Sequence, residues 1–111
     1  GQSFKFKIKK LVYELIKKSI DFQFISSSEN IAWLLNIRGQ DSDFTPIPNS
    51  YLAIDSNKKI NLFCNLRKIN NSLRKKLKDV KLIDIKFIDK FLSKVENKKI
   101  LIDSSTCSFH F

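Results

Sequence analysis

The residues that could do chemistry gather in one stretch of the chain, Ser28 to Ile54. This stretch holds the only tryptophan, Trp33, both prolines, and the second of the two glycines. It is also acidic, because residues 21 to 57 carry five Asp or Glu and a single basic residue, Arg38. The rest of the chain is rich in lysine, so this stretch is the first place to look for a functional site.

Arg38 is the best candidate for a specific contact. It precedes Gly39 at the predicted end of a helix, where a cation is favoured and the backbone can turn sharply. A guanidinium group can bind a carboxylate through two parallel hydrogen bonds. Two interpretations stay open: a structural salt bridge to Asp41 or Asp43, or a contact with a carboxylate of a neighbouring domain or a bound peptide.

Other groups give little support for catalysis or metal binding. The only histidine, His110, lies next to the last residue. Asp41 and Asp43 lack the glycine and downstream glutamate of a calcium-binding loop. Cys64 and Cys107 match no cysteine or histidine spacing of a metal site. We therefore expect no catalytic or metal-binding residue here, turn or capping roles for the two aspartates, and buried apolar roles for the cysteines.

Length and composition predict a single domain, residues 1–111, with a hydrophobic core. No apolar run approaches the ~18 residues that a membrane span needs. The opening GQSFKFKIKK lacks the pattern of a secretory signal, and the two distant cysteines suit a reducing compartment. We expect a cytoplasmic piece of a longer protein, with no membrane partner.

The formal net charge of +10 raises the possibility of nucleic acid binding. Eighteen of the 21 basic residues are lysine, whereas recognition of phosphate and base edges favours arginine. Residues 1 to 20 carry six lysines and one glutamate, so the charge lies outside the distinctive stretch. We expect solvated lysine faces and no specific nucleic acid partner, and a basic RNA-binding module stays as a less favoured alternative.

The first half of the chain predicts two helices around one strand. Residues 4–20 form the first helix, with lysines opposite its apolar face, and residues 21–25 form a buried strand. Ser28 is the expected N-cap of the second helix, Gly39 is its expected end, and residues 40–50 form a loop. The apolar face of the first helix is predicted to hold Phe4, Ile8, Leu11, Val12, Leu15 and Ile16.

The second half predicts an antiparallel hairpin of residues 51–55 and 60–64, in which Asn57 can adopt positive φ. A helix is expected over Leu66 to Leu77. A strand (81–85), a short helix (87–95) and a final strand (99–103) follow. This alternation predicts an α/β domain of three layers, with a mixed β-sheet flanked by helices.

One segment resembles a known family. Residues 30–39, NIAWLLNIRG, followed by Asp41, Phe44, Pro46 and Tyr51, resemble "IAWLLNLRG-x-D-x-x-Y-x-P" of three-domain Xaa-Pro aminopeptidases. These enzymes, also called aminopeptidase P, belong to the creatinase/prolidase group, and the segment lies in their middle, creatinase N-terminal-like domain. The later runs LFCNLRKI and KKILIDSSTCS are similar to strands of that domain. Phe44 stands where the family usually has tyrosine, and Thr45 where asparagine is common.

The resemblance implies a parent hydrolase, a metallopeptidase that removes the N-terminal residue before a proline. By the same resemblance, its two divalent metal ions, commonly manganese in this family, are held by two Asp, two Glu and a His of a C-terminal catalytic domain. No position of this chain corresponds to those ligands. The chain is expected to be an inactive accessory domain whose partners are the N-terminal and C-terminal domains of the same polypeptide, a proline-containing peptide and, as a homodimer, a second copy of the parent.

The resemblance also assigns roles within the segment. The residues expected to contact substrate or a neighbouring domain are Arg38, Asp41, Asp43, Phe44 and Pro46, and those of the structural motif are Trp33, Gly39 and Tyr51. Trp33 is expected to anchor the helix in the core, with an aromatic platform for substrate as the alternative. The alternative function is a catalytically silent relative of the same fold that binds a peptide or a protein.

Overall fold

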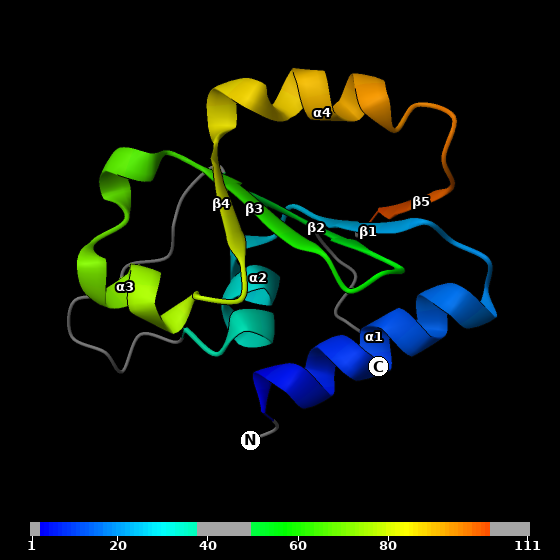
Figure 1. The fold of residues 1–111 in the computed structure, drawn as a ribbon, viewed down its shortest axis with the longest axis horizontal. Helices are drawn as coiled ribbons and strands as arrows, with labels where there is room; N and C mark the ends of the chain where they lie inside the picture. Colours follow the sequence, from blue (N-terminus) through cyan, green and yellow to red (C-terminus); the bar gives the residue numbers. More distant parts are fainter. Residues whose placement is uncertain (1–2, 38–49, 103–111) are drawn as a thin grey trace.

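The structure is a computed structural model that describes residues 3–37 and 50–102. Its centre is a five-stranded sheet in the order β4-β3-β2-β1-β5 (Figure 1). β2 is antiparallel to its neighbours β1 and β3, while β1 pairs with β5 and β3 pairs with β4 in parallel. The predicted mixed sheet and antiparallel hairpin are therefore confirmed. The strands are β1 (Phe22–Ile25), β2 (Tyr51–Asp55), β3 (Ile60–Cys64), β4 (Lys81–Asp84) and β5 (Ile100–Ile102).

Helices cover both faces of this sheet, which confirms the predicted three-layer arrangement (Figure 1). α1, α2 and α3 lie on one face, and α4 lies on the other. Short 3-10 turns at Leu66–Lys68 and Ile85–Phe87 precede α3 and α4. The helices are α1 (Phe4–Lys17), α2 (Ser28–Leu35), α3 (Asn71–Lys76) and α4 (Ile88–Lys94).

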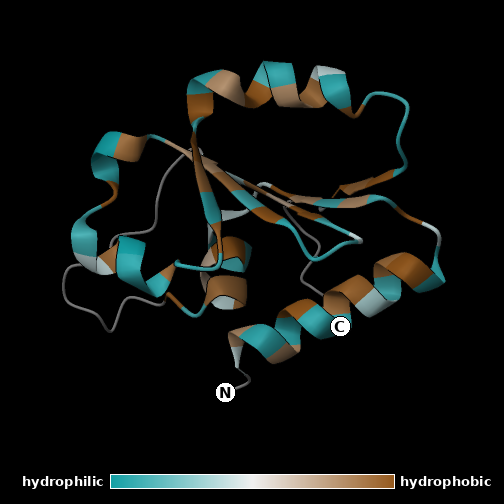
Figure 2. Ribbon diagram, in the orientation of Figure 1, coloured by the Kyte–Doolittle hydropathy of each residue, from teal (hydrophilic) through white to brown (hydrophobic). Residues whose placement is uncertain are grey.

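The main core lies between the sheet and the layer of α1 and α2. Apolar side chains of α1 and α2 form one cluster with those of the strands, and the ribbons of these helices carry brown, hydrophobic segments in Figure 2. Alternate strand residues point into this layer, because successive side chains of a strand face opposite sides. Fully buried members of the core include Leu11, Leu15, Ile25, Leu34, Leu52, Ile54 and Leu62.

The second face of the sheet is covered by α4 through aromatic contacts. Phe91 of α4 lies 4.9 Å from Phe63 of β3, between ring centroids, and 5.7 Å from Phe22 of β1 in an edge-to-face arrangement. Such geometries suit the quadrupoles of the rings. This layer is smaller than the main core, because a single seven-residue helix covers this face.

The first helix is shorter than predicted and one of its residues faces the other way. It ends at Lys17 rather than at residue 20, and Ser19 has a φ of 56° in the turn that follows. Ile16, predicted on the buried face, is 61% exposed. Ile16 follows Val12 by four residues, as the apolar face requires, but Leu15 takes the buried side of this last turn and is 1% exposed.

The predicted ends of α2 are wrong at both sides. Ser27 is the N-cap, because its hydroxyl accepts a hydrogen bond from the Asn30 N–H at 3.3 Å, so Ser28 is already helical. The helix ends at Leu35, and Asn36 takes the left-handed conformation with φ 56° and ψ 39°. Asparagine tolerates this conformation better than other non-glycine residues, so Gly39 is not needed to end the helix.

The predicted helix from Leu66 to Leu77 is broken in two. After the 3-10 turn, Ile69 is extended, with φ −98° and ψ 112°. The Asn70 side chain then caps α3 by accepting a hydrogen bond from the Leu73 N–H at 2.8 Å. Asparagine side chains bind the backbone in this way and compete with a continuous helix. The apolar spacing still places Ile69, Leu73 and Leu77 in the core.

The hairpin between β2 and β3 turns one residue later than predicted. Lys58, not Asn57, has positive φ, at 67°. The Asp55 carboxylate accepts hydrogen bonds from the N–H groups of Asn57 and Lys59, each at 2.8 Å, and these bonds hold the turn. The two hairpin strands have the predicted boundaries, and the other boundaries differ from prediction by at most one residue, as element ends commonly do. Within residues 3–37 and 50–102, none of the helices has the length and apolar character that crossing a membrane requires.

Candidate functional site

The structure describes the residues on both sides of residues 38–49, the part of the distinctive stretch that we call the acidic segment. Residues 38–49 lie outside the described part of the chain, and with them Arg38, Gly39, Asp41, Asp43, Phe44 and Pro46. The residues on either side, Ile37 and Ser50, are each only 2% exposed. The residues that flank the segment on both sides are therefore buried in the domain.

The chain that follows residues 38–49 enters the sheet at one edge. The segment follows α2 and precedes β2, whose first residue lies beside the carboxyl end of β1. Because β2 runs against the other four strands, this edge also holds the carboxyl ends of β1, β3, β4 and β5. Binding sites of α/β domains commonly form outside the carboxyl ends of strands. We call this edge the carboxyl edge.

A buried lysine joins α1 to the end of α2. Lys7 is only 6% exposed, and its ammonium group donates hydrogen bonds to the Trp33 carbonyl and to the Asn36 side-chain oxygen. The same nitrogen lies 4.2 Å from the centroid of the Trp33 ring, a cation–π contact. A cation at this place also complements the negative end of the helix dipole. Lys7 thus fixes the backbone just before the acidic segment begins.

Sequence reasoning missed Lys7 by assigning the helical lysines to solvated faces. The spacing contained a signal, because Lys7 lies four residues before the buried Leu11 and so shares its side of the helix. What the spacing did not show is the set of acceptors. These come from α2, more than 25 residues further along the chain.

Trp33 and Tyr51 stand near the two ends of the segment. Trp33 is half-buried and packs against the main core, which is the geometry of an anchor. Tyr51 is half-buried at the start of β2, and its ring lies 5.4 Å from that of Phe24. The two aromatic residues therefore lie close in sequence to the two ends of the segment. Their positions do not show where its contact residues lie.

Cys64 lies at the carboxyl end of β3 and is fully buried. Burial raises the pKa of its thiol, the negative charge of Asp84 raises it further, and Arg74 partly opposes both. A thiol held in its protonated form is a poor nucleophile and metal ligand. Cys64 is thus the buried apolar residue that the sequence predicts, while Cys107 and His110 lie outside the described residues.

No metal-binding cluster forms among residues 3–37 and 50–102, where no three His, Cys, Asp or Glu side chains come together. Asp41 and Asp43 stay untested, because they belong to the undescribed segment.

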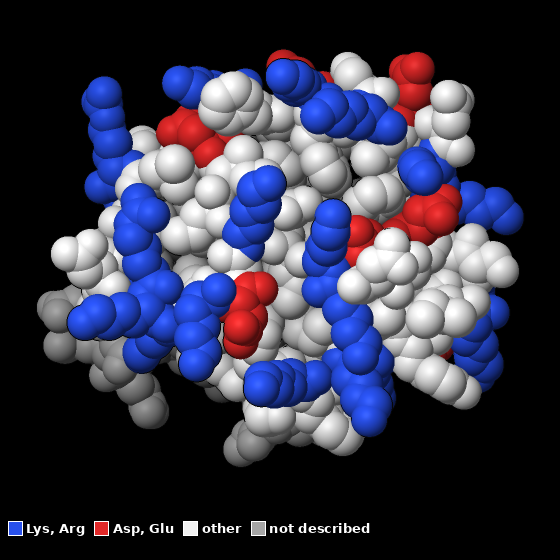
Figure 3. Space-filling model, in the orientation of Figure 1, with Lys and Arg blue, Asp and Glu red and all other residues white. Residues whose placement is uncertain are grey.

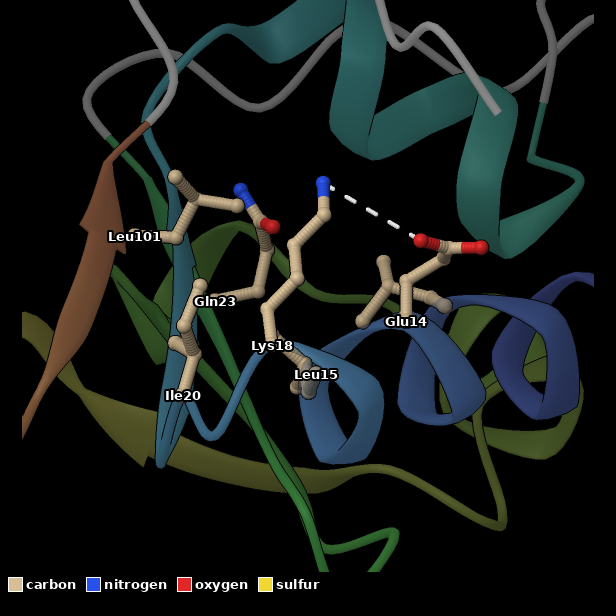
Figure 4. Close-up of a pocket in the computed structure, with 7 residues that line it drawn as sticks. Glu14, Leu15, Lys18, Ile20, Gln23 and Leu101 are labelled. Carbon is tan, nitrogen blue, oxygen red and sulfur yellow. Dashed lines mark ion pairs between the residues drawn. The ribbon is translucent and has the colours of Figure 1, made fainter.

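A small cavity lies between the second half of α1 and the β1–β5 side of the sheet (Figure 4). Its volume is about 50 Å³, enough for a water molecule and too small for a peptide side chain of any length. Gln23, 4% exposed, points its amide into the cavity, and an ion pair of Glu14 and Lys18 at 4.0 Å lies at its side. This cavity is no substrate site. Its lining is Leu11, Glu14, Leu15, Lys18, Ile20, Gln23 and Leu101.

One known protein family matches this chain over its whole length. Residues 1–111 match the family model described as Creatinase/Prolidase N-terminal domain. The chain belongs to this family. The fold just described is thus that of a creatinase/prolidase N-terminal domain, as the sequence resemblance implied.

The similar curated proteins are much longer than this creatinase/prolidase N-terminal domain. The probable Xaa-Pro aminopeptidase P of Coprinopsis cinerea is 34% identical over 117 aligned positions, which cover 96% of this chain and 19% of the relative. Xaa-Pro aminopeptidase 1 of Dictyostelium discoideum is 37% identical over 71 residues, which cover 64% of this chain and 11% of the relative. The chain thus spans a fifth or less of these proteins.

Solved structures show the same fold. The X-prolyl aminopeptidase of Caenorhabditis elegans, described as a cytosolic enzyme with a di-nuclear active site, superposes with a TM-score of 0.71 at 21% identity, over 92% of this chain and 18% of that one. The N-terminal, creatinase/prolidase-like domain of a metallopeptidase from Corynebacterium diphtheriae gives a TM-score of 0.68 at 17% identity. That match covers 96% of this chain and 80% of the bacterial domain.

Proposed function

We propose that this creatinase/prolidase N-terminal domain, residues 1–111, is the non-catalytic middle domain of a larger cytoplasmic Xaa-Pro aminopeptidase. The parent enzyme removes the N-terminal residue that precedes a proline. The observation that carries the proposal is the similarity over 96% of the chain to an aminopeptidase P about five times as long. Relatives of that length have room for the catalytic machinery outside this domain.

Hydrolysis in the parent is assigned to a C-terminal domain. Two divalent metal ions, manganese in our proposal, would there activate a water molecule and polarise the scissile carbonyl. The described residues of this chain bring together no metal-binding cluster. In this proposal they form the core and the docking surface of an accessory domain. The partners in this proposal are the other domains of the polypeptide, a proline-containing peptide and a second copy of the parent.

The role of this domain is to present residues 38–49 to the catalytic domain or its substrate. The support is the anchoring of both ends, through Ile37 and Ser50, and the clamp of Lys7 on the end of α2. Pro46 and Pro48 restrict the backbone freedom of the unbound segment, which lowers the conformational entropy lost when the segment docks. The guanidinium group of Arg38 can then bind a carboxylate through two parallel hydrogen bonds. The other proposed contact residues, Asp41, Asp43, Phe44 and Pro46, follow it closely in the sequence.

Replacing Arg38 by alanine in the complete polypeptide tests this role. We expect kcat/KM for an Xaa-Pro peptide to fall about 10- to 100-fold, the loss that follows when a bound group is misplaced by ~1 Å. The melting temperature should change by less than about 2 °C, since a side chain whose contacts lie in another domain or a substrate adds little to the stability of this domain. Steady-state kinetics and thermal unfolding measure the two effects.

The control is Arg67→Ala, because Arg67 is exposed on the 3-10 turn before α3. Both its activity and its melting temperature should match those of the unchanged protein. A large loss of stability in Arg38→Ala, with normal turnover for each folded molecule, would instead show a structural salt bridge to Asp41 or Asp43.

A further inference from the structure

A second pocket lies near the edge of the sheet opposite the carboxyl edge. It forms between the first half of α1, the β2–β3 hairpin and the turn before β4, and its volume is about 310 Å³. That size is at the lower end of the range of ligand pockets, ~300–1,000 Å³. We call it the hairpin pocket, and it is lined by Phe4, Lys5, Ile8, Lys9, Lys58, Ile60 and Asp79.

The floor and the rim of the hairpin pocket differ in chemistry. Phe4, Ile8 and Ile60 supply an apolar floor that is already largely buried. The rim carries three exposed lysines and one exposed aspartate, so its net charge is positive. The surface view agrees, because basic side chains surround one isolated acidic patch near the lower end of β4 (Figure 3). Such a pocket fits a group that is apolar at one end and anionic at the other.

An apolar stripe continues from the pocket along the outer side of α1. Phe6, Tyr13 and Ile16 are 52%, 63% and 61% exposed. Lys9 lies three residues after Phe6 and four before Tyr13, so it stands on the same side of the helix and joins the stripe to the pocket rim. Exposed aromatic residues are enriched at protein interfaces.

Charge excludes a second copy of this face as the occupant. In a two-fold symmetric contact the same patch meets itself. The pocket rim carries Lys5, Lys9 and Lys58 against the single Asp79, so that contact would bring like charges together, which costs free energy. The occupant must carry the opposite charge.

We propose that the hairpin pocket binds an apolar side chain flanked by a carboxylate, supplied by another segment of the same polypeptide. The assignment of this source rests on the proposed function, in which most of the polypeptide lies outside the domain. A weak site is sufficient for such a partner, because a linked segment is present at an effective concentration of ~1 mM or more. The pocket thus gives the domain a second docking surface, remote from residues 38–49.

N-acetyl-leucine is a suitable probe, since it joins an isobutyl group to a carboxylate. We expect it to bind the ¹⁵N-labelled 111-residue chain with a Kd of ~1–10 mM, the range that linked segments need. Amide shifts should concentrate at the first half of α1 and at the hairpin. N-acetyl-leucinamide, which lacks the charge, and acetate, which lacks the apolar group, should each bind at least about fivefold more weakly.

Two variants of α1 separate a specific site from general attraction to a basic protein. Lys9→Glu changes the pocket rim, whereas Lys10→Glu makes the same charge change at an exposed neighbour that does not line the pocket. Lys9→Glu should weaken the probe at least about fivefold and Lys10→Glu less than twofold. Equal weakening by both, equal binding of the uncharged amide, or shifts elsewhere on the chain would overturn the proposal.

The source of the occupant is tested in the complete polypeptide by hydrogen exchange. Amides of α1 and the hairpin should exchange more slowly there than in the 111-residue chain, and Lys9→Glu should remove the difference. Unchanged exchange, in a pocket that still binds the probe, would contradict a segment of the same polypeptide. Neither measurement involves catalysis, so failure here leaves the aminopeptidase proposal standing, and an inactive parent leaves the pocket standing.

Discussion

Lys7→Met should lower the free energy of unfolding by about 3 kcal/mol, because the oxygens of Trp33 and Asn36 lose a charged donor inside the protein. Methionine keeps the aliphatic stem, so the loss reports the ammonium group rather than its packing. The cation–π contact with the Trp33 ring adds to the loss. Urea unfolding followed by Trp33 fluorescence measures the change, since this is the only tryptophan of the chain.

Lys10→Met is the matched control for Lys7→Met. Lys10 lies on the same helix and is exposed, so its replacement should change the free energy of unfolding by less than about 0.5 kcal/mol. Equal and small effects of the two substitutions would show that Lys7 does not clamp the end of α2. The frame proposed for residues 38–49 would then lose its main support.

Phe63→Ala should cost about 3–5 kcal/mol, the usual loss for a buried phenylalanine. Phe63 lies in β3 with 1% of its surface exposed, and its ring contacts Phe91 of α4 at 4.9 Å between centroids. The substitution therefore opens a cavity between the sheet and α4 and tests the second layer of the fold. Chemical denaturation gives the magnitude.

Leu92→Ala supplies the comparison on α4 itself. Leu92 is an exposed residue of that helix and should cost less than about 1 kcal/mol. Phe63→Ala costing no more than Leu92→Ala would mean that α4 does not cover this face of the sheet.

The alternation of strands and helices was predictable because burial sets it. Apolar spacing of three and four marked α1, and the short β-rich runs marked the strands, so the mixed sheet and its flanking helices follow. The hairpin of β2 and β3 was readable from two apolar runs separated by a polar turn. These features depend on patterns within a few turns of chain.

The ends of the elements were less predictable, because several residues compete for the same cap. Ser27 and Ser28 are both good N-caps, and only the backbone geometry decides between them. Asn36 took the left-handed position expected of Gly39, and Asn70 interrupted what reads as one continuous helix. At Ser27 and Asn70 a short polar side chain binds the backbone locally, whereas Asn36 ends its helix through its left-handed backbone.

Composition alone pointed to the candidate site. It did not point to Lys7, the residue that holds the end of α2 beside that site. Trp33 and the acidic, proline-containing stretch stand out from a lysine-rich sequence without any structure. Lys7 does not stand out, because its burial depends on acceptors supplied by α2 across the core. A charged residue on an apolar helix face is informative only when its partner is known.

The most direct test compares the complete polypeptide with the 111-residue chain, each supplied with Mn²⁺ and an Xaa-Pro peptide such as Arg-Pro-Pro. We expect the complete polypeptide to release the N-terminal residue and the 111-residue chain to release none above the buffer rate. Release by the 111-residue chain would place catalysis inside this domain, and an inactive complete polypeptide would mark a catalytically silent relative. Either result would contradict an accessory domain of a working aminopeptidase.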